Sequence, residues 1–242
     1  MLEEIEDSLS PTDDSDSQDE SLYSFRLFHF QEIKCCRGEG RPKPRSGHRI
    51  VQYKGRIYSF GGYNPAIELD DPDLLDDEYW VDSKPLFKEL WELNLTTGRW
   101  TKCEMKGDIP EQLASHTAVC HPLDPSVMLI YGGTGAPFGL TTSNTVVSCH
   151  LETQQFKKLV TKEGEGQPMA LYGQAVITDN EGLFYTVGGT TGYHYFMDVN
   201  MLDLRSSPPV WSSLYRLSGA MDEPRPRSVA TTLALIITSQ VP

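Results

Sequence analysis

The feature that most constrains the fold of this chain is a pattern that recurs three times along it. An apolar stretch with the alternation of a β-strand ends each time in a pair of glycines, at intervals of roughly 50 to 70 residues. The pairs are Gly61-Gly62, Gly132-Gly133 and Gly188-Gly189. Because glycine accepts a positive φ and lets neighbouring strands approach closely, these six residues are predicted to be structural.

Three further features accompany every glycine pair in the same order. A turn and short strand open the unit, at residues 45–48, 113–116 and 171–174, and a third strand follows the pair, at residues 90–93, 146–151 and 199–204. An aromatic residue closes each unit: Trp100, Phe156 and Trp211. We expect this aromatic to cover the bare glycine surface. Such a unit buries its faces only against its neighbours, so stacked units share a continuous core.

The repeated unit resembles the kelch repeat, and the resemblance implies an all-β fold, a kelch-type β-propeller. We expect about three blades and the start of a fourth at Pro224–Ser228, which is an incomplete ring. The boundaries are an acidic tail at 1–22, predicted to be disordered, a partial propeller at 23–228, and an atypical apolar end at 229–242. An N-terminal strand is expected at Phe25–Ile33. Residues 64–87 form an acidic insertion, predicted to protrude as a loop from the first blade.

The charge of the chain bears on its partners and its compartment. A net charge of −13 argues against nucleic acid, which requires a basic face, and against anionic membrane surfaces. The acidic N-terminus differs from a secretory signal peptide. Five cysteines without paired C-x-x-C spacing indicate free thiols in a reducing compartment. We therefore expect a cytoplasmic protein, with the nucleus as a second compartment.

The sequence contains no catalytic constellation, and we expect no metal and no cofactor. His48 and His116 occupy equivalent positions in two units, where they could either approach each other around a metal or bond the backbone of the neighbouring blade. Residues 133–139 resemble a phosphate-binding loop only loosely, because they lack the Lys-Ser/Thr ending, and a blade loop that needs glycine dihedrals is the favoured explanation. Cys35 and Cys36 could form a redox or metal pair, but adjacent cysteines rarely chelate one ion together. A copper oxidase site built from Tyr, His and Cys is a further alternative, although packing in strands and loops explains most of these Tyr and Cys residues.

Within the kelch proteins the chain resembles the substrate receptors of Cullin-2 ubiquitin ligases. The segments that carry this resemblance are Pro44–His48, Gly61–Pro65, Pro85–Trp91, Gly132–Gly139, Leu171–Ala175 and Gly188–Tyr193. The resemblance implies a six-bladed propeller that reads the C-terminal tails of client proteins, with a link to stress-kinase signalling. It also implies docking to Elongin and Cullin-2 through a C-terminal helical box, which we do not expect within residues 229–242. The alternative is a scaffold without ubiquitin, for cytoskeletal or stress-signalling partners.

Function in a propeller is expected in the loops at the ends of the blades. Arg45 is predicted to bind the carboxylate of a client tail, because a guanidinium fork suits that group. The alternative reading is an arginine that bridges adjacent blades. The candidate partner-binding residues are Arg45, His48, Tyr63, Asn64, His116, Tyr172, Gln174, Tyr193 and Arg225.

Overall fold

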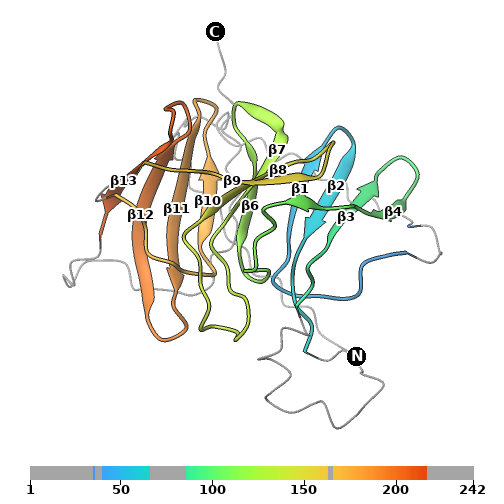
Figure 1. Cartoon of the computed structure of the whole chain (residues 1–242), viewed down its shortest axis with the longest axis horizontal. Helices are drawn as coiled ribbons and strands as arrows, with labels where there is room; N and C mark the ends of the chain where they lie inside the picture. The colour runs from blue at the N-terminus through green and yellow to red at the C-terminus, as the bar shows by residue number, and fades with distance from the viewer. Residues whose placement is uncertain (1–34, 36–39, 66–85, 163–165, 217–242) are drawn as a thin grey trace, which may run out of the picture. The chain divides into compact units, whose positions relative to one another are not determined.

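The computed structural model describes residues 35, 40–65, 86–162 and 166–216 of the chain. These residues form three β-sheets without a helix (Figure 1), so none of them provides a helix that could cross a membrane. Several predictions lie outside the described residues: the acidic tail, the strand at Phe25–Ile33, the interior of the acidic insertion, Arg225 with the fourth unit, and the apolar end.

The first blade is a sheet of four antiparallel strands that follow one another in the chain. They are β1 (Arg49–Tyr53), β2 (Arg56–Phe60), β3 (Leu90–Asn94) and β4 (Arg99–Lys102). The acidic insertion separates β2 from β3, but its ends belong to the blade. Leu86 forms a bridge with Tyr63, and Phe87 is buried. Residues 86 and 87, at the C-terminal end of the predicted 64–87, therefore pack as part of the blade.

The second blade adds a fifth strand to the same pattern. Its strands are β5 (Lys106–Gly107), β6 (Thr117–His121), β7 (Asp124–Tyr131), β8 (Val146–His150) and β9 (Gln155–Lys158). The short β5 pairs parallel to β9 at the outer edge, whereas the other strands of this blade pair antiparallel. The linking segment thus joins the sheet before it turns inward to β6.

The third blade repeats the four-stranded arrangement. It consists of β10 (Ala175–Thr178), β11 (Leu183–Thr190), β12 (Tyr195–Asp203) and β13 (Val210–Tyr215). Here the second strand continues through Gly188 and Gly189, with a register shift at that point, instead of ending at the pair. The closing aromatics Trp100, Phe156 and Trp211 lie on the fourth strands β4, β9 and β13.

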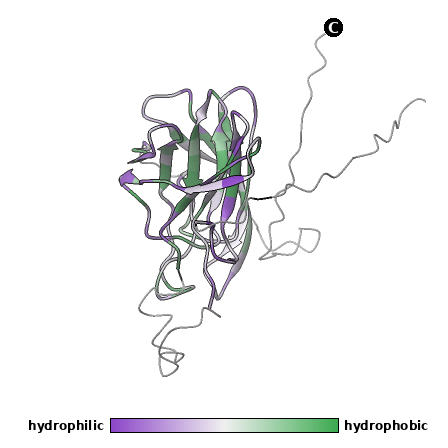
Figure 2. Ribbon diagram, turned by 90° about the vertical axis from the view of Figure 1, so that its right-hand side faces the viewer, coloured by the Kyte–Doolittle hydropathy of each residue, from purple (hydrophilic) through white to green (hydrophobic). Residues whose placement is uncertain are grey.

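The core lies between the blades, in two apolar clusters. Figure 2 shows hydrophobic residues along the strands. Between the first and second blades, the Phe60 and Phe156 rings are 5.4 Å apart, and between the second and third, the Tyr131 and Trp211 rings are also 5.4 Å apart. Each pair joins the aromatic before a glycine pair to the closing aromatic of the next blade. Since β6 contacts both β1 and β10, the three blades are consecutive members of one propeller.

We expected the closing aromatics to cover the glycine pairs. Backbone and polar groups cover them instead. All six glycines have positive φ. A side chain at Gly61 would overlap the Leu113 carbonyl and approach His116 Cε1 to 2.9 Å. At Gly132 it would approach Gln174 Nε2 to 2.6 Å. The bare surface therefore admits the opening turn of the next blade.

Backbone hydrogen bonds complete the contact between blades. The N–H groups of Gly62 and Gly133 donate to the carbonyls of Leu113 and Leu171, at 2.6 and 3.0 Å. These bonds fix the opening turns of the second and third blades on the glycine pair of the preceding blade. The loops that follow the glycine pairs are thereby held at one end of the strands, along the lower edge of Figure 1.

Candidate protein-binding face

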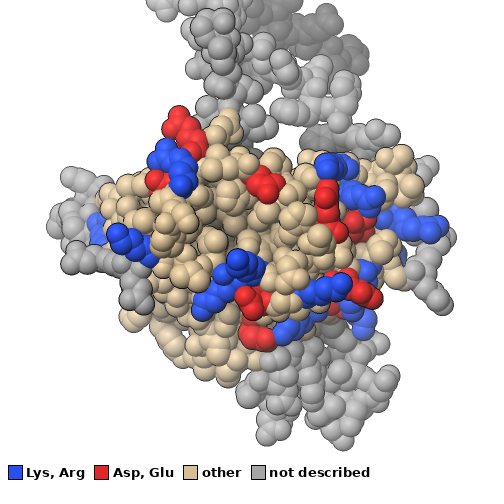
Figure 3. Space-filling model, turned by 45° about the horizontal axis from the view of Figure 1, so that its top comes forward, with Lys and Arg blue, Asp and Glu red and all other residues tan. Residues whose placement is uncertain are grey.

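The loops that follow the three glycine pairs form a face with an unusual composition. Residues 61–65, 132–145 and 188–195 contain no Asp, Glu, Lys or Arg, and are rich in Gly, Thr and Tyr. The opposite, hairpin end carries basic side chains beside acidic ones (Figure 3), including the ion pairs Lys54–Glu152 at 2.8 Å and Arg205–Asp203 at 2.9 Å. Tyrosine with small polar residues is the composition of many protein-binding loops, so the uncharged end is the candidate site.

An aromatic row crosses this face from blade to blade. The Tyr63 ring of the first blade lies 5.0 Å from Phe138 of the second, and Phe138 lies 6.0 Å from Tyr172 of the third. Backbone bridges hold the ends of the row, from Tyr63 to Ser46 and from Tyr172 to Thr190. Aromatic rings supply large contact areas at low entropic cost. The aromatic row, defined as Tyr63, Phe138 and Tyr172, is therefore a preformed contact surface.

The loop that carries Phe138 is fixed by its own hydrogen bonds. The N–H of Gly135 donates to the Thr141 carbonyl at 3.0 Å, and the N–H of Gly139 donates to Thr134 Oγ1 at 2.8 Å. The N–H of Gly133 is committed to the next blade. The amides that a phosphate would require are thus engaged, which favours the blade-loop interpretation of residues 133–139.

Exposed side chains flank the aromatic row. Tyr193 is 75% exposed, and Tyr195, Leu140 and Met169 are also exposed. Asn64, at the first-blade end, donates its side-chain amide to the Pro44 carbonyl at 2.8 Å, so it positions the loop. Of the predicted residues, Tyr63, Tyr172 and Tyr193 therefore belong to this face.

Arg45 does not offer its guanidinium to a ligand. It donates to Glu89 Oε2 at 2.8 Å, to the Gly61 carbonyl at 3.1 Å and to the Lys43 carbonyl at 3.0 Å. Its Cζ lies 3.9 Å from the centre of the Phe87 ring, and its side chain is only 3% exposed. All of these contacts lie within the first blade. They account for Arg45 without a client carboxylate and without a bridge between blades.

Glu89 is the centre of this polar cluster. It accepts hydrogen bonds from Arg45, from Trp91 Nε1 at 2.9 Å and from Lys102 Nζ at 2.7 Å. Burial alone would raise the pKa of the Glu89 carboxyl, but these bonds outweigh it and lower the pKa to about 2. The cluster joins the two sides of the acidic insertion, and it was missed because the insertion separates Arg45 from Glu89 in the sequence.

His48, His116 and Gln174 lie beneath the face, against the glycine pairs. Gln174 donates to the Leu171 carbonyl at 2.9 Å, which belongs to its own opening turn. Neither nitrogen of the fully buried His116 forms a well-aligned hydrogen bond with a described residue. Among the described residues, no three His, Cys, Asp or Glu side chains gather as a metal site would require.

His116 is expected to make stability depend on pH. Burial, together with the Arg49 charge, outweighs the Leu113 carbonyl and lowers the His116 pKa from 6.5 to about 3. Since the folded protein disfavours the proton, the contribution of His116 is complete above pH 6.5 and is lost as the pH falls toward 3. Relative to His116→Gln, the wild type should lose about 1.4 kcal/mol per pH unit.

Urea unfolding of both proteins between pH 6.5 and 4.5 measures this slope, above the range in which Glu89 titrates. Gln174 shows that glutamine fits the equivalent position, so His116→Gln should fold normally at pH 7. Parallel stability curves for the two proteins would contradict the assignment.

The described cysteines are consistent with a chain that has free thiols. Cys35, Cys103, Cys120 and Cys149 form no disulfide. Burial raises the pKa of Cys103 to about 11 and that of Cys149 to about 12, so both remain protonated and inert.

Residues 10–232 match the model of the Attractin/LZTR1 β-propeller family. The chain belongs to this family. The kelch relatives agree: Kelch domain-containing protein 10 of Mus musculus is 38% identical over 191 residues, which are 79% of this chain and 40% of the relative. Its Drosophila melanogaster homolog is 35% identical over 187 residues, which are 73% of this chain and 28% of the relative.

The chain thus spans about two fifths of the length of the Kelch domain-containing protein 10 relatives of Mus musculus and Homo sapiens. The solved structure of YjhT covers 73% of this chain and 53% of its own, with a TM-score of 0.55 at 17% identity, which shows the fold alone. Together these findings establish the chain as a kelch-repeat β-propeller protein of this family, with the three blades described above.

Proposed function

We propose that this chain is a protein-interaction module that recognises clients for a Cullin-2 type ubiquitin ligase, and that its uncharged loop face contacts the client tail without catalysing a reaction. The aromatic row carries the proposal, because it places Tyr63, Phe138 and Tyr172 on one surface that spans three blades. The similarity to Kelch domain-containing protein 10 over most of the chain supports it.

The loop face has the chemistry that an extended polypeptide tail requires. Hydroxyl groups of Thr and Tyr can bond the backbone of a peptide, while the rings contact its side chains. Because its loops contain no charged side chains, such a face would not select for charged side chains of the client. This property suits tails that end in small, uncharged residues. In the cell, we place this activity in the cytoplasm and the nucleus.

Phe138→Ala is expected to weaken binding of a client C-terminal peptide by at least about tenfold, because Phe138 links the two ends of the aromatic row. Stability should change little, since the ring is only partly buried. Isothermal titration with free-acid and amidated peptides measures the effect. Leu123→Ala, at the exposed hairpin end, is the matched control and should bind as the wild type does.

A pull-down of Elongin and Cullin-2 with the same chain tests the ligase part of the proposal separately. Equal binding of free-acid and amidated peptides would exclude the reading of C-terminal carboxylates. Client binding without any ligase component would favour the scaffold alternative for this chain.

A further inference from the structure

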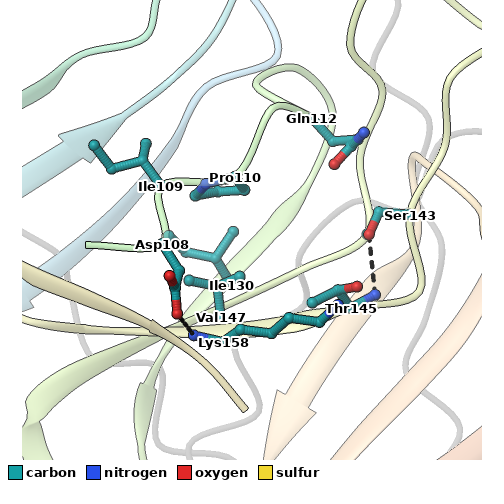
Figure 4. A pocket seen from close by; sticks show the side chains of 10 residues that line it. Asp108, Ile109, Pro110, Gln112, Ile130, Ser143, Thr145, Val147 and Lys158 are labelled. Atoms are coloured by element: carbon teal, nitrogen blue, oxygen red, sulfur yellow. Dashed lines mark hydrogen bonds between the residues drawn. The ribbon is translucent and has the colours of Figure 1, made fainter. Parts of the chain in front are cut away.

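A pocket of about 190 Å³ opens on the second blade, beneath the segment between β5 and β6 (Figure 4). Its apolar wall consists of Ile109, Pro110, Ile130 and Val147. The Asp108 carboxylate lies at one end and accepts the backbone N–H of Lys158 at 3.0 Å. The Lys158 side chain runs away from Asp108, along the pocket and beneath Thr145 (Figure 4). The pocket therefore combines an apolar wall with a cationic side chain.

The repeat makes it possible to compare this place with the other blades. The equivalent place in each blade is marked by a row of three residues that pair directly with one another across neighbouring strands. The row starts on the second strand, two residues before the first glycine of the pair, and continues onto the third and fourth strands. In the second blade the row is Ile130, Val147 and Lys158. In the first blade it is Ser59, Trp91 and Lys102. In the third blade it is Thr186, Asn200 and Ser213.

In the first blade, the chain itself fills the equivalent place. The Lys102 ammonium lies 2.7 Å from Glu89 Oε1 and 5.8 Å from the centre of the Trp91 ring. Trp91 Nε1 donates to the other oxygen of the same carboxylate at 2.9 Å. A lysine at this position is thus satisfied by an acidic side chain immediately before β3 and by an aromatic ring two residues later, within β3.

In the second blade, both of these groups are missing. Thr145 stands where the first blade has Glu89, and Val147 stands where it has Trp91. The lysine is retained as Lys158, and no acidic side chain of the described residues forms an ion pair with its ammonium. The pocket is the space that the smaller side chains leave. The third blade lacks the lysine altogether, so this combination belongs to the second blade.

We propose that the pocket binds a segment of a partner protein that carries an acidic residue two positions before an aromatic one. In an extended segment these side chains point to the same side. The carboxylate takes the place of Glu89 on the Lys158 ammonium and on Thr145, as a charge-assisted hydrogen bond. The ring takes the place of Trp91 against Ile130 and Val147. The inference takes from the proposed function only that the ligand is a protein. It requires neither a ubiquitin ligase nor recognition of a client's C-terminal carboxylate.

The probe is the capped tripeptide acetyl-Glu-Leu-Trp-amide, titrated into the 242-residue chain and followed by NMR. Lys158→Gln should weaken its binding by on the order of tenfold, the loss of one charge-assisted bond. Thr145→Glu should abolish binding, because it supplies the carboxylate from within. Lys157→Gln is the matched control: Lys157 is the exposed neighbour on β9 and points to the opposite side. It should bind within about twofold of the wild type.

The same peptide with Gln in place of Glu should bind about tenfold more weakly to the wild type, because it lacks the charge. The absence of saturable binding of the Glu peptide would overturn the proposal, as would equal binding of the two peptides or of wild type and Lys158→Gln. Neither peptide presents a free carboxyl terminus, so these results are independent of the client-tail measurements.

Discussion

Replacing Gly61 by alanine is expected to lower the free energy of unfolding by more than about 4 kcal/mol, a loss that few single substitutions cause. The new Cβ would overlap the Leu113 carbonyl, which also accepts the Gly62 N–H. The opening turn of the second blade would have to move, and the buried contact between Phe60 and Phe156 would open with it. Urea unfolding at pH 7 measures the effect.

Gly55→Ala is the matched control for this prediction. Gly55 has nearly the same φ as Gly61, 71° against 69°, but no atom lies within 4 Å of its added Cβ. Its substitution should cost only about 1–2 kcal/mol, the strain of the left-handed conformation. Equal losses in the two variants would mean that dihedral strain alone explains the glycine pairs, and that close approach of the next blade does not.

The fold was predictable because the repeat combines two local requirements in a fixed order. A positive φ at the glycine pairs and an apolar alternation before them can each be read from a few neighbouring residues. Contacts between blades cannot be read in this way. That Phe156 packs on Phe60, and not on the glycines, depends on the position of the next blade, for which the sequence of one unit contains no signal.

The candidate site was predicted only in part for the same reason. Tyr63, Tyr172 and Tyr193 were expected on the loops from their places in the repeat. Phe138 contacts both Tyr63 and Tyr172. It was not predicted, because the segment around it was interpreted through its glycines and their resemblance to a phosphate-binding loop. That no described acidic side chain forms an ion pair with Lys158 became apparent only by comparison with Lys102 of the first blade, which contacts Glu89.

The partner of Arg45 could not be predicted, because the acidic insertion separates Arg45 from Glu89 in the sequence. The sequence predicts that charge reversal at Arg45 weakens carboxylate binding and spares the fold. The structure instead leads us to expect that Arg45→Glu lowers the free energy of unfolding by about 3–5 kcal/mol, because a buried charge pair loses one partner. The new carboxylate would face the Glu89 carboxylate. The variant would also lose the hydrogen bond to the Gly61 carbonyl and the contact between the guanidinium and the Phe87 ring.

Lys43→Glu makes the same change of charge at an exposed position two residues away, and should alter stability by less than about 0.5 kcal/mol. The deficit of Arg45→Glu should also depend on pH. Because the Glu89 pKa is lowered from 4.5 to about 2, its stabilising contribution is complete above pH 4.5 and is lost as the pH falls toward 2. Urea unfolding at pH 7 and pH 3 should therefore show a smaller gap between wild type and Arg45→Glu at the lower pH. A variant as stable as wild type at pH 7, with client binding lost, would restore Arg45 to the role that its sequence position first indicated.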